Sequence, residues 1–114
     1  MGFKLDFEEK ERIQESTKIV LKYPTRIPII VEKDEKCKLN DINKKKYLVP
    51  RDMAMNQFLF IIRKRINLEP SQSLFVMVGD RLTSSNVILG EIYENHKDED
   101  GFLYMIYTSE NTFG

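Results

Sequence analysis

The sequence contains 114 residues, of which 41% are hydrophobic, including 7 Phe and 5 Tyr. A chain of this length forms one domain and buries about two-thirds of its unfolded surface, so it can build a core without disulfides. The composition excludes disorder of the whole chain. A membrane-spanning helix is also excluded, because no run approaches the roughly 20 apolar residues that a bilayer crossing needs.

The formal net charge is zero, from 18 Lys/Arg and 18 Asp/Glu, but the two signs are unevenly distributed along the chain. Residues 1–65 carry 16 basic and 10 acidic residues, a net charge of +6, whereas residues 66–114 carry 2 and 8, a net charge of −6. This asymmetry predicts a basic docking face and an acidic opposite end. It does not identify the partner.

The first residues and the cysteine content predict a cytoplasmic protein. Residues 1–6 match neither a secretory signal nor a myristoylation motif. The single cysteine, Cys37, excludes an internal disulfide and a cysteine-based metal cluster. A reducing compartment is the expected setting for such a chain.

The first predicted element is a helix over residues 8–22, which is rich in Glu, Lys, Arg and Gln and ends before Tyr23-Pro24. Helical spacing gives it a stripe that we expect to face the core, made of Ile13, Thr17, Val20 and Leu21. Glu15 and Ile19 fall together on another side. Ile19 is therefore either idle surface or a contact for a partner.

Two short strands are predicted next, over residues 27–31 and 47–49, with a charged loop over residues 33–45 between them. Pro28 lies in the first strand and Pro50 closes the second, which is typical of a sheet edge or a strand start. Strand alternation places Pro28 and Ile30 on one face of the first strand. The opposite face then holds Ile27, Ile29 and Val31.

A longer helix is predicted from an N-cap at Asp52 through Ile66. Its broad apolar face consists of Met55, Phe58, Leu59, Ile61, Ile62 and Ile66. Residues 74–78 predict a fully buried strand, residues 86–94 a short helix and residues 102–107 a last strand. Residues 109–114 show no burial pattern, and we expect a mobile tail.

This order of elements, two strands, a helix and two strands around a short helix, is that of an α+β, ubiquitin-like β-grasp fold with helical residues added in front. The prediction is a four-stranded mixed sheet with packed helices. Order alone does not exclude other α+β arrangements.

Few residues could carry catalysis or hold a metal. Cys37 lies among lysines, and the only histidine, His96, has no neighbour in sequence that would fix its orientation, so an incidental thiol is favoured over a Cys/His dyad. The acidic run at residues 98–100 lacks the spacing of a calcium loop and predicts a solvated turn. With no Gly-rich phosphate loop either, the sequence argues against an enzyme and against a metal site.

Two other surfaces leave alternatives open. The basic clusters at residues 44–46 and 63–65 could meet phosphates, which makes a small basic-faced nucleic-acid-binding domain the alternative function. They are not interleaved with aromatic residues as a base-stacking platform would be, so docking of an acidic protein is favoured. The strand at residues 47–49 could accept an added peptide strand, or its side chains could all face the core.

Five runs carry a resemblance to a known family: residues 22–28 (KYPTRIP), 45–50 (KKYLVP), 62–66 (IRKRI), 96–104 (HKDEDGFLY) and 110–114 (ENTFG). As a set they resemble the autophagy ubiquitin-like modifiers, the family of the GABA-receptor-associated protein and the microtubule-associated light chains. The similarity extends from about Glu15 to Gly114. It implies two N-terminal helices in a helical extension at residues 1–24, a β-grasp core at residues 25–108 and a flexible conjugation tail at residues 109–114.

The resemblance implies a conjugation substrate and not an enzyme, with no cofactor apart from the attached lipid. In this family the carboxylate of the terminal glycine, here Gly114, passes between thioesters on an activating and a conjugating enzyme and is joined to the amine of phosphatidylethanolamine. A cysteine protease processes and deconjugates such proteins. The expected localisation is the cytoplasm, and the autophagosomal or a related membrane after lipidation, with no nucleic acid among the partners.

The resemblance also implies docking of cargo receptors and autophagy factors through short motifs of an aromatic residue, two variable residues and an aliphatic residue. The pocket for the aromatic residue would consist of Glu15, Ile19, Pro28, Ile30, Lys46, Leu48 and Phe102. The pocket for the aliphatic residue would consist of Tyr47, Val49, Pro50, Met53, Phe58 and Ile61. Acidic residues that flank the motif would meet Arg26, Lys44, Lys46 and Arg65.

Overall fold

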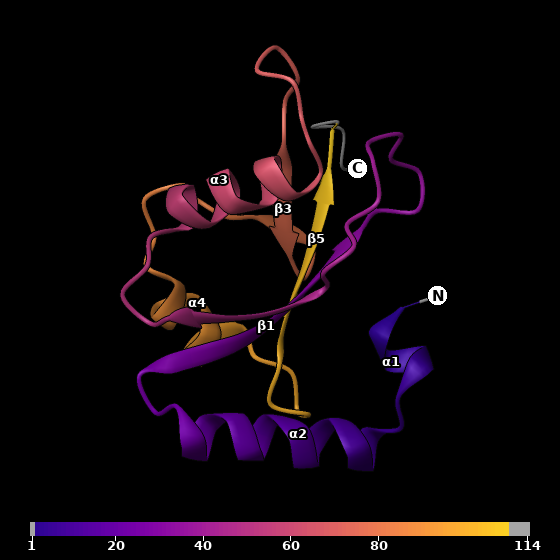
Figure 1. The fold of residues 1–114 in the computed structure, drawn as a ribbon. Helices are drawn as coiled ribbons and strands as arrows, with labels where there is room; N and C mark the ends of the chain where they lie inside the picture. The colour runs from indigo at the N-terminus through magenta and orange to yellow at the C-terminus, as the bar shows by residue number, and fades with distance from the viewer. Residues whose placement is uncertain (1, 110–114) are drawn as a thin grey trace.

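The computed structural model describes residues 2–109 (Figure 1). The chain forms helices α1 (Phe3–Asp6) and α2 (Glu9–Lys22), strands β1 (Arg26–Lys33) and β2 (Lys46–Pro50), helix α3 (Met55–Arg65), strands β3 (Phe75–Val78) and β4 (Arg81–Leu82), helix α4 (Leu89–His96) and strand β5 (Leu103–Thr108). The two N-terminal helices and every strand and helix expected from the sequence are present. The two-residue strand β4 is added to the four that were predicted. The expected mobile tail lies, beyond Ser109, outside the described residues.

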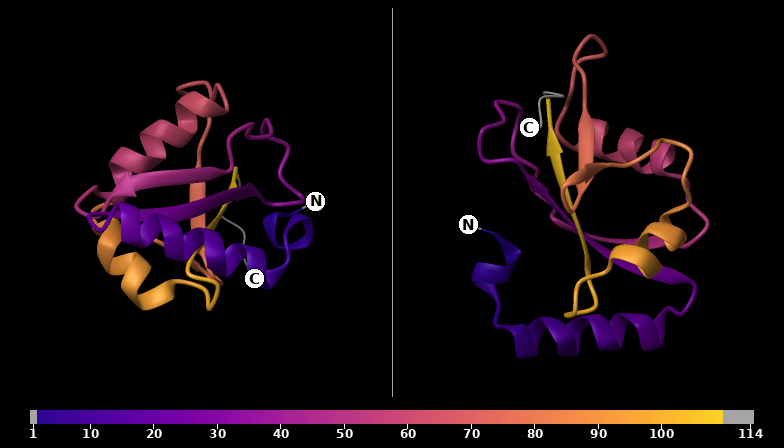
Figure 2. Two further views of the ribbon diagram at one scale, coloured as in Figure 1. Left: turned by 60° about the horizontal axis from the view of Figure 1, so that its bottom comes forward. Right: turned by 180° about the vertical axis from the view of Figure 1, so that it is seen from behind.

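The strands form one mixed sheet in the order β2-β1-β5-β3-β4. The central pair, β1 and β5, is parallel, and the other pairs are antiparallel. Strand β2 therefore lies at one edge, as the proline-bounded sequence at residues 46–50 predicted. Helices α3 and α2 lie on opposite sides of β1 and β2 (Figures 1 and 2).

The two faces of the sheet pack into separate apolar clusters. The main core lies between the sheet and helices α3 and α4 and includes Ile27, Ile29, Val31, Phe58 and Tyr107. A smaller cluster on the other face joins Phe3, Ile30 and Phe102, with Ile19 and Tyr104 packed against it. The alternation predicted for β1 is therefore confirmed, because Ile30 faces one cluster and its neighbours face the other.

Helix α2 packs by a different side from the one that its apolar stripe predicted. Ile13, Val20 and Leu21 are 41%, 40% and 78% exposed, whereas Arg12 and Ser16 are buried. Arg12, Ser16 and Ile19 recur at helical spacing, so it is this mixed stripe that faces the sheet. The loop before β5 supplies polar partners for it, and hydrogen bonds rather than apolar area decide the orientation of the helix.

Helix α3 begins two residues later than predicted, with its N-cap at Ala54 and not at Asp52, and α4 begins three residues later. Residues 53–55 pair with residues 87–89 instead: the Met55 N–H donates to the Val87 carbonyl and the Leu89 N–H to the Met53 carbonyl, both at 2.8 Å. A bridge between Ala54 and Ile88 accompanies these bonds. This pairing keeps both segments extended, so each helix starts only after it.

Strand β3 is not buried on both faces as predicted. Val76 and Val78 face the main core, but Phe75 and Met77 are only half-buried on the other side of the sheet. Helices α1 and α2 cover that side only in part. Among the described residues, no helix has the length and apolar character needed to cross a membrane.

Candidate functional site

The candidate site is the free edge of β2. The strand pairs with β1 along one side, with Pro28 opposite Leu48 and Ile30 opposite Lys46. Within residues 2–109 no strand pairs with its other side. An unpaired edge presents backbone N–H and C=O groups that an extended peptide can engage.

Side chains alternate along β2 and mark two surfaces. Tyr47 and Val49 are buried in the main core, on the side of α3. Lys46, Leu48 and Pro50 project toward the opposite face and remain exposed or half-buried. Of the β2 residues expected in the two pockets, Lys46 and Leu48 therefore lie on one face, and Tyr47 and Val49 lie on the other. Pro50, which was expected around the aliphatic side chain, lies on the face of Lys46 and Leu48.

The seven residues expected around a motif's aromatic side chain come from four places in the chain: α2, β1, β2 and the residue before β5. Ile19, Ile30 and Phe102 belong to the smaller apolar cluster. Ile30 and Phe102 are 0% exposed and form its floor. Lys46 pairs with Glu15 and so links β2 to α2 above this floor. A peptide side chain that reached the floor would have to displace this exposed ion pair.

The residues expected around the aliphatic side chain also lie together, between β2 and α3. Tyr47, Val49 and Phe58 are buried in the main core, with Met53 and Ile61 half-buried against it. Pro50, the sixth residue, is exposed at the end of β2. Burial raises the pKa of the Tyr47 phenol, and the positive charge of Arg65 partly opposes the rise. The apolar surface here is therefore made by Met53, Ile61 and Pro50, while Tyr47, Val49 and Phe58 lie buried beneath it.

The four basic residues expected to meet acidic flanks are all exposed around the edge strand. Arg26 lies opposite Pro50 in the β1–β2 register, at one end of β2. Lys46 begins the strand at the other end, and the Lys44 ammonium lies 5.1 Å from the centre of the Tyr47 ring. Arg65 is near enough to Tyr47 to affect its pKa. Positive charge therefore lies at both ends of the free β2 edge.

Two residues of the second basic cluster, at residues 63–65, contact other parts of the chain. Arg63 donates to the backbone carbonyls of Glu69 and Gln72, at 3.1 and 2.8 Å. The Lys64 ammonium lies 4.6 Å from the centre of the Phe60 ring.

The residues considered for catalysis are not brought together. Cys37 is buried, with its sulfur 3.4 Å from the Leu39 nitrogen and 3.9 Å from the Ser109 hydroxyl. His96 is exposed at the end of α4. In the part of the chain that the structure describes, no cluster of three His, Cys, Asp or Glu residues could hold a metal ion.

The sequence did not predict that Asp100, next to the candidate site, is buried. Asp100 was expected in a solvated turn but is 1% exposed. Its carboxylate lies 3.3 Å from Arg12 Nη1 and accepts hydrogen bonds from the Phe102 N–H and the Tyr104 hydroxyl. No local signal in the sequence could have found it, because α2 is polar on nearly every side and its residues Arg12 and Ser16 do not stand out from their neighbours.

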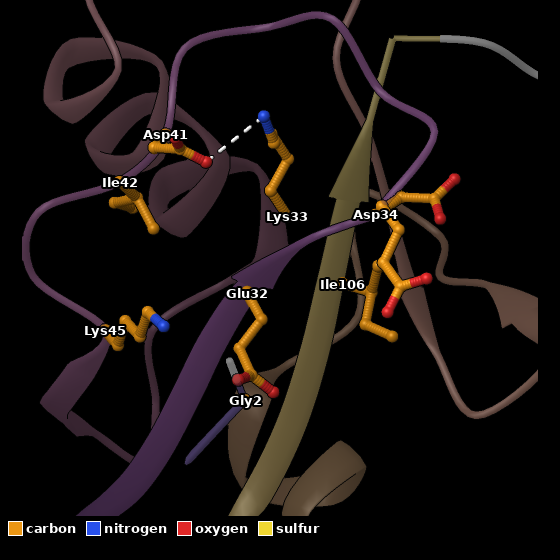
Figure 3. A pocket seen from close by; sticks show the side chains of 9 residues that line it. Gly2, Glu32, Lys33, Asp34, Asp41, Ile42, Lys45 and Ile106 are labelled. Atoms are coloured by element: carbon orange, nitrogen blue, oxygen red, sulfur yellow. Dashed lines mark ion pairs between the residues drawn. The ribbon is translucent and has the colours of Figure 1, made fainter. Parts of the chain in front are cut away.

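A separate hollow lies near the far end of β1 (Figure 3). It encloses about 710 Å³ and contains none of the predicted pocket residues. Glu32 and Asp34 are among the residues that line it. Lys33 pairs with Asp41 at 3.1 Å, and Glu32 accepts the Phe3 N–H at 2.7 Å. We place the site at the β2 edge because an extended peptide needs free backbone groups and apolar pockets, and this acidic hollow offers neither.

The β-grasp sheet and its two leading helices define a ubiquitin-like protein with an N-terminal helical extension. Residues 11–114 match the family model described as "Autophagy protein Atg8 ubiquitin like". Autophagy-related protein 8B of Oryza sativa is 50% identical over 113 residues, which cover 99% of this chain and 95% of that protein. Autophagy-related protein 8b of Arabidopsis thaliana is 51% identical, with 99% and 93% covered.

Solved structures agree with these sequence matches. The crystal structure of Trypanosoma brucei ATG8 superposes with a TM-score of 0.92 at 38% identity and covers 100% of this chain and 98% of that one. Plasmodium falciparum Atg8, solved in complex with a P. falciparum Atg3 peptide, gives a TM-score of 0.89 at 34% identity, with 96% and 97% covered. The chain belongs to the Atg8 family of autophagy ubiquitin-like modifiers.

Proposed function

We propose that this protein is conjugated through the carboxylate of Gly114 to phosphatidylethanolamine and then recruits proteins that carry an aromatic-x-x-aliphatic motif. Membership of the Atg8 family supports the first step. In that step the protein is the substrate of activating and conjugating enzymes and of a deconjugating cysteine protease, and it performs no chemistry of its own. It needs no cofactor, and it acts in the cytoplasm and, once lipidated, on autophagosomal or related membranes.

The free edge of β2 is the observation that carries the second step. A peptide that adds a strand beside residues 46–50 gains backbone hydrogen bonds, while its side chains point alternately to the two faces of the sheet. Residues three apart in such a peptide point to opposite faces. An aromatic residue and an aliphatic residue at that spacing therefore match apolar surfaces on the α2 side and the α3 side of β2.

The positive charges around the free edge of β2 favour some of these peptides over others. The start of β2 is bordered by Lys46, Lys44 and Arg65, and its end is bordered by Arg26. This arrangement favours acidic residues on either side of the motif. The complex of Plasmodium falciparum Atg8 with an Atg3 peptide supports the idea that a peptide of the conjugating enzyme is itself one of the partners. We expect cargo receptors and the conjugating machinery to compete for one surface.

A reconstituted reaction tests the conjugation step. The protein is incubated with ATP, activating enzyme, conjugating enzyme and liposomes that contain phosphatidylethanolamine, and the lipidated form is resolved on a urea gel. Deleting Gly114 should abolish both the thioester and the lipid conjugate, and should leave the melting temperature and peptide docking unchanged. A lipidated band from the truncated protein would overturn the assignment of the carboxylate.

A titration at physiological salt tests the docking step. One arm uses an acidic aromatic-x-x-aliphatic peptide, and the other uses a random oligonucleotide of similar charge. The proposal expects saturable binding of the peptide and only weak, salt-sensitive binding of the oligonucleotide. Tight oligonucleotide binding without a response to the peptide would favour the nucleic-acid-binding alternative instead.

A further inference from the structure

Asp100 is a buried carboxylate in the loop between α4 and β5. Its side chain is 0% exposed, and the side chain of its partner Arg12 is 10% exposed. Burying a charge costs several kcal/mol unless it is paired and hydrogen-bonded. The Phe102 N–H, at 2.9 Å, and the Tyr104 hydroxyl provide the additional donors. The carboxylate is therefore held by several donors, and these contacts fix the position of the loop, while the buried Nε of Arg12 has no hydrogen-bond partner within the described residues.

The same loop holds α2 at two successive turns of the helix. Arg12 contacts the Asp100 carboxylate at 3.3 Å, and the Ser16 hydroxyl donates to the Asp100 backbone carbonyl at 2.5 Å. The approach is close at Gly101, where φ is +91° and an added Cβ would lie 2.3 Å from Ser16 Oγ. The helix therefore rests directly on the loop, with no room for a side chain between them.

This contact lies next to the residues expected to form the aromatic pocket. Glu15 and Ile19 project from α2 beside Arg12 and Ser16, and Phe102 follows Asp100 by two residues. Helix α2 thus supplies Glu15 and Ile19 to one wall of the aromatic pocket, and the loop before β5 supplies Phe102 to its floor. Apolar burial contributes little to the packing of α2 against the sheet and this loop, because Ile19 is half-buried while Ile13 and Val20 remain exposed.

We propose that Asp100 is a positioning residue for the aromatic pocket: through Arg12 and Ser16 it sets the distance between α2 and Phe102, and so the width of the pocket. This inference rests on the proposed peptide-docking function and deepens it. The aliphatic pocket lies between β2 and α3 and contains no residue of α2. A loosened helix should therefore weaken binding of the aromatic side chain alone.

The experiment measures a preference instead of a single affinity. Two synthetic acidic peptides are titrated by NMR, one with Trp at the aromatic position and one with Ala there, otherwise identical. The Asp100→Asn variant keeps the size of the side chain and removes its charge. Glu94→Gln is the matched control, because it changes the net charge equally at an exposed position on α4. The ion-pair partners of Glu94 are Arg51 and Lys97, and neither belongs to the aromatic pocket.

Asp100→Asn should weaken binding of the Trp peptide by about tenfold and leave binding of the Ala peptide unchanged, so that the Trp-over-Ala preference falls by the same factor. Glu94→Gln should keep the full preference. General destabilisation would weaken both peptides equally. That result, or an unchanged preference in Asp100→Asn, would overturn the inference.

A second variant covers the case in which Asp100→Asn does not fold. Arg12→Lys keeps the charge opposite Asp100 but shortens the reach and loses the planar guanidinium, so it should reduce the preference by a smaller factor. An undiminished preference in Arg12→Lys would also count against the inference. Failure of the wild-type protein to bind the Trp peptide would overturn the proposed function itself, which separates the two failures.

Discussion

The ring of Tyr47 packs edge-on against the ring of Phe58, with 5.5 Å between the ring centres and 88° between the planes. The pair joins β2 to α3 beneath the surface assigned to the aliphatic residue. Among the described residues nothing hydrogen-bonds to the buried Tyr47 hydroxyl. The packing contribution of this ring therefore comes from its apolar body, and its hydroxyl is a buried polar group that folding must desolvate.

Tyr47→Phe should consequently leave the free energy of unfolding unchanged or raise it by up to about 1 kcal/mol, because it removes an unsatisfied polar group and keeps the ring. Denaturant unfolding measures the difference. Tyr107→Phe is the matched control: the Tyr107 hydroxyl donates to the Asn40 carbonyl at 2.5 Å, so its removal should cost about 1 kcal/mol. Equal losses in both variants would contradict the expectation.

Leu48→Ala should weaken the binding of an aromatic-x-x-aliphatic peptide by about 1–3 kcal/mol, the size of a hot-spot truncation. Leu48 is half-buried on the face of β2 that looks toward α2. Calorimetry on the folded variant gives the difference. Leu82→Ala, at an exposed leucine of the opposite edge strand β4, should bind the peptide as the wild type does. Equal affinities for wild type and Leu48→Ala would show that the peptide does not bind at this edge.

Peptide affinity should fall as salt rises from about 0.02 M to about 0.15 M, because the Debye length shortens to about 8 Å and screens exposed charges. Arg65→Gln should make this dependence shallower. Arg81→Gln, an exposed arginine on β4, should keep the wild-type slope. If the wild-type affinity does not change with salt, the basic residues around the edge of β2 are only solvated and do not attract the peptide.

The stability of the protein should fall in acid partly through Asp98. Burial by itself would raise the pKa of this carboxyl, but hydrogen bonds from Lys4 and from the Asp100 backbone, with the charges of Lys4 and Arg12, lower the pKa overall. A folded-state pKa below the unfolded value gives stability that is present above the unfolded pKa of about 4 and is lost as the pH falls through the folded value.

Asp98→Asn should therefore flatten the dependence of unfolding free energy on pH between about pH 5 and pH 2, as measured by denaturant titration. Glu99→Gln, at the exposed neighbouring residue, should leave the wild-type dependence in place. A profile for Asp98→Asn as steep as that of the wild type would show that the Lys4–Asp98 pair, at 2.6 Å, contributes nothing to acid sensitivity.

The sequence by itself determined the elements other than α1 and β4, and the alternation of the faces of β1. Ile27, Ile29 and Val31 had to share one face of β1 because strand geometry has a period of two, and Pro50 fitted an edge because proline cannot donate to a second neighbour. These are local properties of the backbone and need no partner. The family resemblance added the pocket residues, which the fold brings together on the two faces of β2.

Only the tertiary structure decided which side of α2 meets the sheet. The apolar stripe at Ile13 and Val20 was visible in the sequence, but Arg12 and Ser16 are the residues that are buried. Their partner, Asp100, lies 88 residues from Arg12, and no local pattern shows that such a carboxylate will be desolvated. Buried polar groups must be satisfied wherever their partners lie, so this requirement outweighed the burial of a modest apolar stripe.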